Sequence, residues 1–155
     1  MLWAMSGPVI IGWKEIIHLP EWDIGGLSAK SDTGARSCAI DVSKITELPD
    51  GRVSFEVILD RGAATRTRRV EAAVVGRTVV RSSNGRSQLR YRVRTEVRIG
   101  PHSKLADFTL VNRRRMIHRV LLGRIFMAGD FLVDSSQVYV HGGKPARRSA
   151  RIQKS

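Results

Sequence analysis

The residues of this sequence best suited to chemistry are Asp32, Thr33 and Gly34, which follow an apolar segment at residues 24–29. A glycine after the acid lets the chain turn tightly and frees backbone N–H groups that can point at the carboxylate. The threonine hydroxyl can brace such a turn, and the small Ala35 leaves room beside Asp32. If Asp32 is catalytic, Thr33 and Gly34 are therefore the residues that support it. The alternative is an ordinary turn at the end of a strand, where these residue types are common.

An aspartic peptidase needs two carboxylates that share one proton, because two like charges a few Å apart do not both ionise easily. The ionised carboxylate takes a proton from water, and the protonated one polarises the scissile carbonyl. The chain contains Asp-Thr-Gly once, at residues 32–34, and its other aspartates lack that setting. The second carboxylate therefore has to come from another copy of the chain. We predict a homodimer in which Asp32 meets the partner subunit's Asp32 on a two-fold axis.

Four further motifs accompany this one in a fixed order over residues 9–142. In chain order the five are 11–15 (IGWKE), 30–37 (KSDTGARS), 82–85 (SSNG), 112–116 (NRRRM) and 121–124 (LLGR). Together they resemble the retropepsin-like aspartic proteases, and more closely the group named "ATP-dependent zinc proteases". That group is linked to RimK-type glutamate ligases, and its RimB-like members trim poly-glutamate tails. The resemblance implies an aspartic-type peptidase with an all-β, closed acid-protease barrel and an acidic substrate, for example a glutamate-tailed ribosomal protein. It also implies that Asp32 is the catalytic residue, supported by Thr33 and Gly34.

The Asn84-Gly85 pair is a strong hairpin signal. It lies where the flap hairpin of a retropepsin lies in chain order. A flap would exclude water from the cleft and hold the substrate backbone as an added strand. By this resemblance Ser82, Ser83, Asn84 and Gly85 are predicted to bind substrate. The alternative is an ordinary surface hairpin.

Arg36 follows the Asp-Thr-Gly-Ala sequence directly, at a position where retroviral enzymes usually carry an acid. A guanidinium so close to the catalytic turn can pair with substrate carboxylates, and with suitable geometry it does so through two hydrogen bonds. This departure from the retroviral pattern therefore favours an acidic substrate. The alternative is a structural ion pair between Arg36 and Asp41 or Glu56.

Residues 89–99 give the clearest strand pattern in the sequence, because apolar or uncharged residues alternate with charged ones. Alternation places the arginines of this strand together on one face, where they can contact an acidic peptide. Besides the four hairpin residues, the predicted substrate-binding residues are Ala35, Arg36, Arg90, Arg92, Arg94 and Arg124.

The charge of the chain is strongly positive, with 27 basic and 14 acidic residues among 155 and a net charge of +13. Such a protein attracts polyanions, including nucleic acid, acidic protein tails and poly-glutamate. The second functional hypothesis is therefore a non-catalytic basic module on the same barrel that binds nucleic acid or the ribosome. Charge alone does not choose between the hypotheses, because a basic surface also promotes solubility.

The sequence contains no motif that indicates a metal site or a cofactor site. The four histidines lack the spacing of metal ligands, and there is no glycine-rich phosphate loop, so we expect neither metal nor cofactor. The single cysteine, Cys38, excludes an internal disulfide and is expected to be buried. No apolar run is long enough to span a membrane, and we expect a cytoplasmic protein.

The length allows one domain with a substantial core. We predict a flexible N-terminus at residues 1–8, a barrel domain at 9–142 and a disordered basic tail at 143–155. Short strands separated by turns favour an all-β barrel, with a short helix at 124–128. The strands are expected at 9–17, 27–32, 37–42, 52–59, 65–75 (a pair or one bent strand), 78–82, 89–99, 105–111, 118–122, 131–133 and 138–141.

Overall fold

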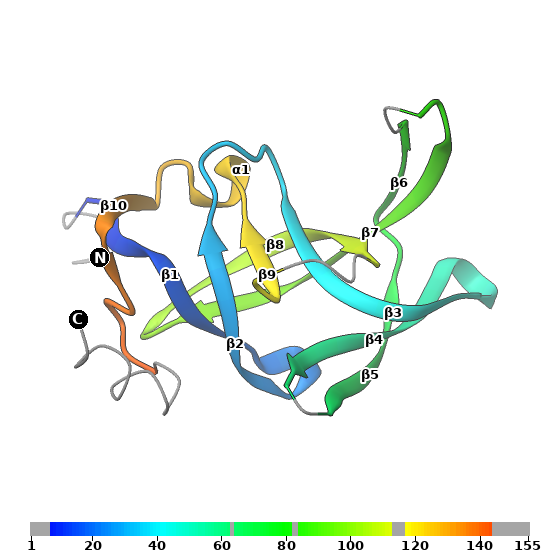
Figure 1. Ribbon diagram of the computed structural model, residues 1–155, viewed down its shortest axis with the longest axis horizontal. Helices are drawn as coiled ribbons and strands as arrows, with labels where there is room; N and C mark the ends of the chain where they lie inside the picture. Colours follow the sequence, from blue (N-terminus) through cyan, green and yellow to red (C-terminus); the bar gives the residue numbers. More distant parts are fainter. Residues whose placement is uncertain (1–6, 63, 82–83, 113–116, 144–155) are drawn as a thin grey trace.

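The computed structural model describes residues 7–62, 64–81, 84–112 and 117–143, and strands dominate it (Figure 1). The strands are β1 (Val9–Leu19), β2 (Ile24–Ser31), β3 (Cys38–Leu48), β4 (Arg52–Arg61), β5 (Thr65–Ala73), β6 (Gly76–Arg81), β7 (Ser87–Ile99), β8 (His102–Val111), β9 (Val120–Leu122) and β10 (Phe131–Val138). A short helix, α1 (Arg124–Met127), and two 3-10 turns, Pro20–Trp22 and Pro49–Gly51, complete the described elements. None of the described helices is long and apolar enough to cross a membrane.

Six of the strands form a closed barrel in the order β1-β2-β9-β3-β8-β7. The ring closes where His18 of β1 pairs with Arg98 of β7. Strand β10 extends the sheet beyond β1, while β4 and β5 continue it from β3. Strand β6 pairs with β7 alone, and this hairpin stands away from the barrel in Figure 1. The all-β, closed-barrel prediction is therefore confirmed.

The core lies inside the barrel and is filled by alternate residues of its strands, including Leu27, Ile40, Phe108 and Leu122, each at most 2% exposed. Burying each such side chain contributes about 1.5–3 kcal/mol. Cys38 belongs to this core, as predicted, and burial raises the pKa of its thiol to about 11. The thiol therefore stays protonated at neutral pH.

The structure decides one open point of the predicted strand pattern and corrects another. Residues 65–75, for which the sequence left a pair or one bent strand open, contain a single strand, β5. The two short strands predicted at 131–133 and 138–141 are instead one strand, β10. The Asp134 carboxylate accepts hydrogen bonds from the Ser136 backbone N–H and hydroxyl and from the Gln137 side chain. These hydrogen bonds pair polar groups of residues 134–137, which the sequence analysis placed between two separate strands.

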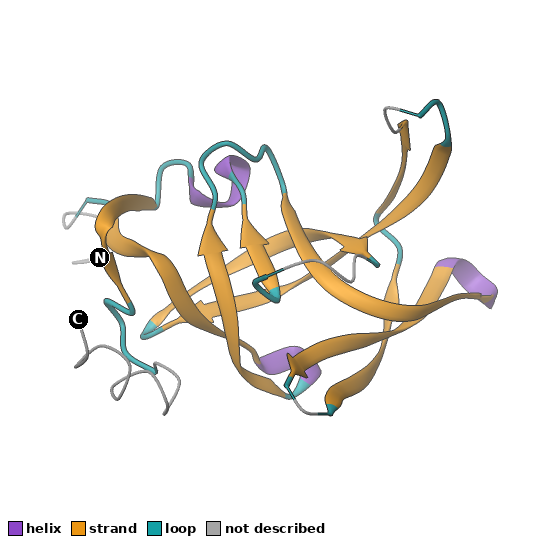
Figure 2. Cartoon of the chain, viewed as in Figure 1, coloured by secondary structure: helices purple, strands orange, loops and turns teal. Residues whose placement is uncertain are grey.

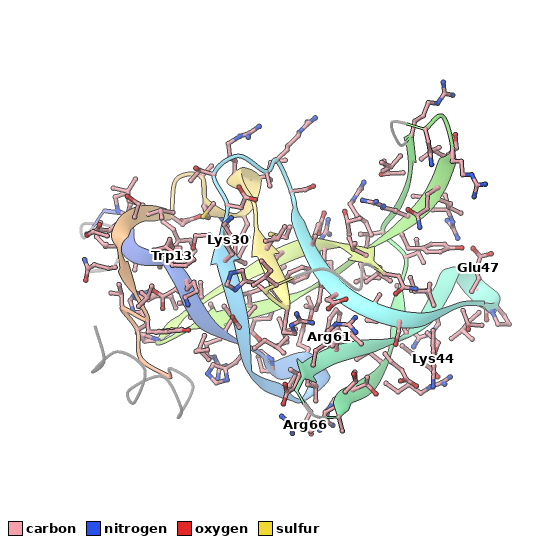
Figure 3. The ribbon with its side chains drawn as sticks, in the orientation of Figure 1. Trp13, Lys30, Lys44, Glu47, Arg61 and Arg66 are labelled. Atoms are coloured by element: carbon pink, nitrogen blue, oxygen red, sulfur yellow. The ribbon has the colours of Figure 1, made fainter. Side chains whose placement is uncertain are left out.

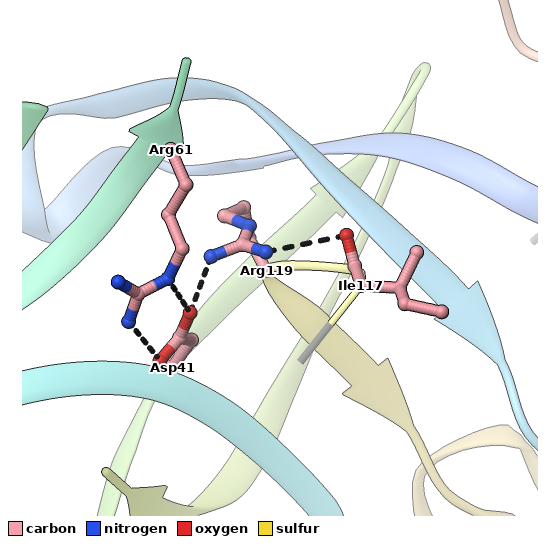
Figure 4. A network of polar contacts seen from close by, with 4 residues as sticks. All are labelled: Asp41, Arg61, Ile117 and Arg119. Atoms are coloured by element: carbon pink, nitrogen blue, oxygen red, sulfur yellow. Dashed lines mark hydrogen bonds and ion pairs between the residues drawn. The ribbon is translucent and has the colours of Figure 1, made fainter. Parts of the chain in front are cut away.

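A buried acid binds two arginines on the β3–β4 side of the barrel (Figure 4). Asp41 of β3 has no exposed side-chain surface. Arg61 at the end of β4 donates to Asp41 from Nε (3.1 Å) and Nη2 (3.2 Å). Arg119, just before β9, donates to the same carboxylate and also to the carbonyl of Ile117 (3.2 Å). This network attaches the segment before β9 to two other strands.

A second buried acid, Glu15 of β1, has no exposed surface. Its carboxylate accepts hydrogen bonds from the backbone N–H groups of Gly12 (2.7 Å), Val140 (3.0 Å) and His141 (3.4 Å). Glu15 thus attaches the chain after β10 to the beginning of β1. A carboxylate with three backbone donors can remain buried, because a buried charge needs such compensation.

Candidate active site

Asp32 lies directly after β2, in the loop that leads to β3. Strand β9 runs between β2 and β3, parallel to β2 and antiparallel to β3. The Asp32 N–H donates to the carbonyl of Leu122 (2.9 Å), which carries the β2–β9 pairing one residue past the end of β2. Just before it, the buried Ser31 hydroxyl donates to the carbonyl of Gly12 (2.8 Å). Both neighbouring strands therefore fix the direction in which the chain delivers Asp32.

The turn after Asp32 has the local geometry that its residue types predict. The Gly34 N–H donates to Asp32 Oδ1 (3.0 Å), and the Ala35 N–H donates to the Asp32 carbonyl (3.1 Å). This is an Asx-type turn, so the ordinary-turn interpretation describes its shape correctly and leaves its chemistry open. Asp32 is half-buried, while Thr33 and Gly34 are exposed. One carboxylate oxygen is thus oriented by the turn, and the side chain remains accessible.

The last of the five motifs, residues 121–124, contacts this turn through Arg124. The Arg124 N–H donates to the carbonyl of Ala35 (2.9 Å). The Arg124 guanidinium donates from Nη1 to the carbonyls of Thr33 and Gly34, both at 3.2 Å. Figure 2 shows α1, which begins at Arg124, directly beside the loop that joins β2 to β3. The structure therefore places Arg124, which the sequence assigned to substrate, against the backbone of the Asp32 turn.

We expect the substitution Gly123→Ala to destabilise the protein by about 1–3 kcal/mol, because it forces extra atoms into a packed site. A methyl group at Gly123 would lie 2.5 Å from the Ser37 backbone, so the β2–β3 loop would have to move. Urea unfolding measures this loss. The control is Gly25→Ala, whose methyl would meet only the side chain of His18. Equal stability of Gly123→Ala and wild type would contradict the close packing.

A groove of about 900 Å³ lies between α1, the outer faces of β3, β7 and β8, and the β6–β7 hairpin. It brings Arg36 together with three arginines of β7. Its lining residues include Arg36, Arg90, Arg92 and Arg94, with Thr78 and Val80 from the hairpin. Asp32 is not among the described residues that line it. The expected hairpin is confirmed, with Asn84 and Gly85 at its tip, whereas Ser82 and Ser83 lie outside the described residues.

The groove arginines differ in how their charge is balanced. Arg94 donates to Asp107 from Nε (2.6 Å) and Nη2 (3.2 Å), and this pairing holds the pKa of Asp107 below its usual value. Asp107 therefore stays ionised and offsets the charge of Arg94. The Arg92 guanidinium lies over Gly76, where a methyl group would be 2.3 Å from its Nη2. In the part of the chain described, Arg36 forms no hydrogen bond or ion pair through its side chain.

The alternative ion pair for Arg36 is wrong within the described structure. Asp41 binds Arg61 and Arg119 in the buried network. Glu56 binds Lys44 and accepts a hydrogen bond from Thr67. Both acids are thus occupied by residues that the sequence gave no reason to select.

Three neighbouring basic side chains, on β1, on β2 and just before β9, were missed by the sequence analysis. Lys30 is the last residue but one of β2 and precedes Asp32 by two residues. Lys14 is its direct neighbour on β1. The pKa of His118 is lowered by burial and further by the charges of Lys14, Lys30 and Arg119. The two-residue spacing of Lys30 and Asp32 was the available signal, whereas Lys14 and His118 depend on strand pairing.

These features define a retropepsin-like barrel with one Asp-Thr-Gly turn in each chain. A family model described as "RimB-like: Retropepsin-like aspartic endopeptidase RimB" matches residues 10–144. The chain therefore belongs to the RimB-like family of retropepsin-like aspartic endopeptidases.

Relatives named "Probable alpha-L-glutamate ligase" share this region. The protein from Shewanella pealeana is 34% identical over 138 residues, covering 87% of this chain and 30% of the relative. That from Parasynechococcus marenigrum is 32% identical over 133 residues, covering 84% and 28%. The chain thus spans less than a third of the length of these relatives. A crystal structure of a Legionella pneumophila protein of unknown function has 26% identity and a TM-score of 0.71, covering 86% of this chain and 98% of that one.

Proposed function

We propose that this protein is a homodimeric aspartic endopeptidase that cleaves acidic polypeptides, with Asp32 and the partner subunit's Asp32 as the catalytic pair. The observation that carries the proposal is the position of Asp32 at the open end of β2, in a turn held by β9 and by Arg124. No other carboxylate of the described chain contacts Asp32. A second copy related by a two-fold axis supplies the missing acid without any further residue.

The chemistry requires one ionised and one protonated carboxylate. The ionised Asp32 takes a proton from water, whose oxygen attacks the carbonyl carbon of the scissile bond, while the protonated acid gives its proton to the carbonyl oxygen. The tetrahedral intermediate then collapses. The C–N bond breaks, the nitrogen leaves with a proton, and the pair again holds one shared proton. The hydrogen bond from the Gly34 N–H keeps Asp32 oriented through both steps.

An acidic substrate is supported by the charge of the groove and of the chain. Arg36 and Arg92 line the groove, and no acid of the described chain binds the Arg36 side chain. The net charge of +13 draws polyanions toward the molecule from a distance. The relatives named as glutamate ligases contain this region within a longer chain, which favours a poly-glutamate tail as the polymer that is cut.

We expect the wild-type protein to remove residues from a glutamate-tailed protein, with a kcat/KM that falls steeply as salt is raised. The substitution Arg36→Gln should lower kcat/KM by about 10- to 100-fold, because a hydrogen bond to a charged group contributes about 1.5–3 kcal/mol. Mass spectrometry of the tail measures cleavage, and size measurements at the assay concentration report the dimer.

The matched control is Arg66→Gln, because Arg66 pairs with the exposed Asp60 and lies on β5 outside the groove. Its kcat/KM should remain close to that of wild type. A dimer that never cleaves acidic tails, or a protein that works as a monomer, would overturn the proposal. Salt-resistant binding to RNA without cleavage would favour the basic-module alternative instead.

A further inference from the structure

Lys14 and Lys30 are direct cross-strand neighbours on β1 and β2. Like charges at such positions destabilise a sheet. Both lysines are only partly exposed, so water screens them incompletely. Within the described part of the chain, Lys30 forms no hydrogen bond or ion pair through its side chain. The fold thus places two positive charges against each other without an acid bound to Lys30.

Aromatic and polar side chains surround Lys14 and the neighbouring His118. The Lys14 ammonium lies 4.9 Å from the ring centre of Trp13 and 5.5 Å from that of Tyr139. The His118 ring contacts Trp13 edge-on at 6.2 Å, and its Nδ1 lies 3.3 Å from the Ser28 hydroxyl. Figure 3 shows Trp13 and Lys30 on the adjoining strands β1 and β2. Lys14 and His118 are thus held by ring and polar contacts, and Lys30 is close enough for its charge to lower the pKa of His118.

The lysine pair lies on the same sheet face as the arginine groove but beside Asp32. One row of cross-strand neighbours runs from Lys30 through Leu121, Ala39 and Thr109 to Arg92. Lys30 and Arg92 lie at the two ends of this row, and the three residues between them are uncharged. Lys30 is two residues from Asp32, whereas Arg92 is four strands away from β2. Along this row, Lys30 is thus closer than Arg92 to the turn that carries Asp32.

We propose that Lys14 and Lys30, with His118 beside them, form a subsite that binds the side-chain carboxylate of the substrate residue adjoining the scissile bond. The inference rests on the proposed function of Asp32 and adds a selectivity to it. The arginine groove attracts an acidic chain in general, while this subsite requires an acid at one position. Two ammonium groups on one carboxylate also remove the repulsion between the lysines when substrate binds.

The test compares peptides that differ only in glutamate or glutamine next to the cleaved bond. Wild type should prefer glutamate by at least about 10-fold in kcat/KM, as expected for a charge-assisted contact. The variant Lys30→Gln should lose most of this preference, and Lys30→Arg should retain part of it. Lys30→Gln removes a like-charge contact, so the protein should fold at least as stably as wild type.

The control is Lys44→Gln, since Lys44 pairs with Glu56 and lies at the β3–β5 end of the molecule in Figure 3. If Lys30→Gln keeps the full preference while wild type cleaves, the subsite is wrong and the role of Asp32 stands. If wild type cleaves nothing, the proposed function fails. Calorimetry with a short oligo-glutamate peptide and the Asp32→Asn protein then decides the subsite. Weaker binding after adding Lys30→Gln supports it, and unchanged binding overturns it.

Discussion

Replacing Asp32 with asparagine should lower kcat by about 10²–10⁴-fold, the usual contribution of a positioned acid or base, while leaving the fold intact. The asparagine oxygen can still accept the hydrogen bond from the Gly34 N–H, so the turn keeps its shape. Cleavage of a glutamate-tailed protein measures the loss, and urea unfolding measures the stability. The control is Asp50→Asn, at an exposed turn residue with φ 65°, a conformation that asparagine also tolerates.

Mixing the two forms tests whether the acids act as a pair. If each site needs Asp32 from both subunits, only wild-type dimers are active, and activity follows the square of the wild-type fraction. After subunit exchange, an equal mixture should therefore retain about one quarter of the activity. A linear dependence, with about one half retained, would show that each chain works alone.

The largest effect on stability is expected from Asp41→Asn, at about 3–5 kcal/mol, because removing one partner leaves buried charge without compensation. In wild type, Arg61 and Arg119 both donate to this carboxylate, which has no exposed surface. The neutral amide keeps the volume, but its NH₂ group replaces one of the two oxygens that accept from the arginines. Urea unfolding of the purified variant measures the change.

The control for that substitution is Asp60→Asn, which breaks an exposed ion pair with Arg66. An exposed pair contributes about 0–1 kcal/mol, so this variant should unfold close to wild type. Equal losses for the buried and the exposed acid would contradict the structural importance of the Asp41 network. Asp41 does not contact Asp32, so activity per folded molecule should survive in the Asp41 variant.

The sequence predicted the local features of the site well because their causes are local. The turn at residues 32–34 follows from an acid, a hydroxyl and a glycine after a strand, and its internal hydrogen bonds span only two or three residues. The β7 strand was recognisable from alternation alone. Its arginines reach the same groove as Arg36, because the face of a strand is fixed by the two-residue period.

The features that escaped prediction depend on pairing between distant segments. Asp41 lies 20 residues from Arg61 and 78 from Arg119, so no local pattern joins them. Lys14 and Lys30 become neighbours only through the β1–β2 register, and a shift of one residue would turn one of them to the other face. The family resemblance named the motifs that carry Lys14 and Lys30, but the pairing showed that these motifs meet.

The contact between Arg124 and the Asp32 turn has a consequence for how the protein is assembled. The turn that carries Asp32 is braced by Arg124, which lies 91 residues later in the chain. Contacts between such distant residues form late, because the entropy of closing the long intervening segment is lost before the contact can stabilise the fold. During synthesis, Asp32 is therefore present long before Arg124. The Asp32 turn gains its contact with Arg124 only after most of the chain has left the ribosome.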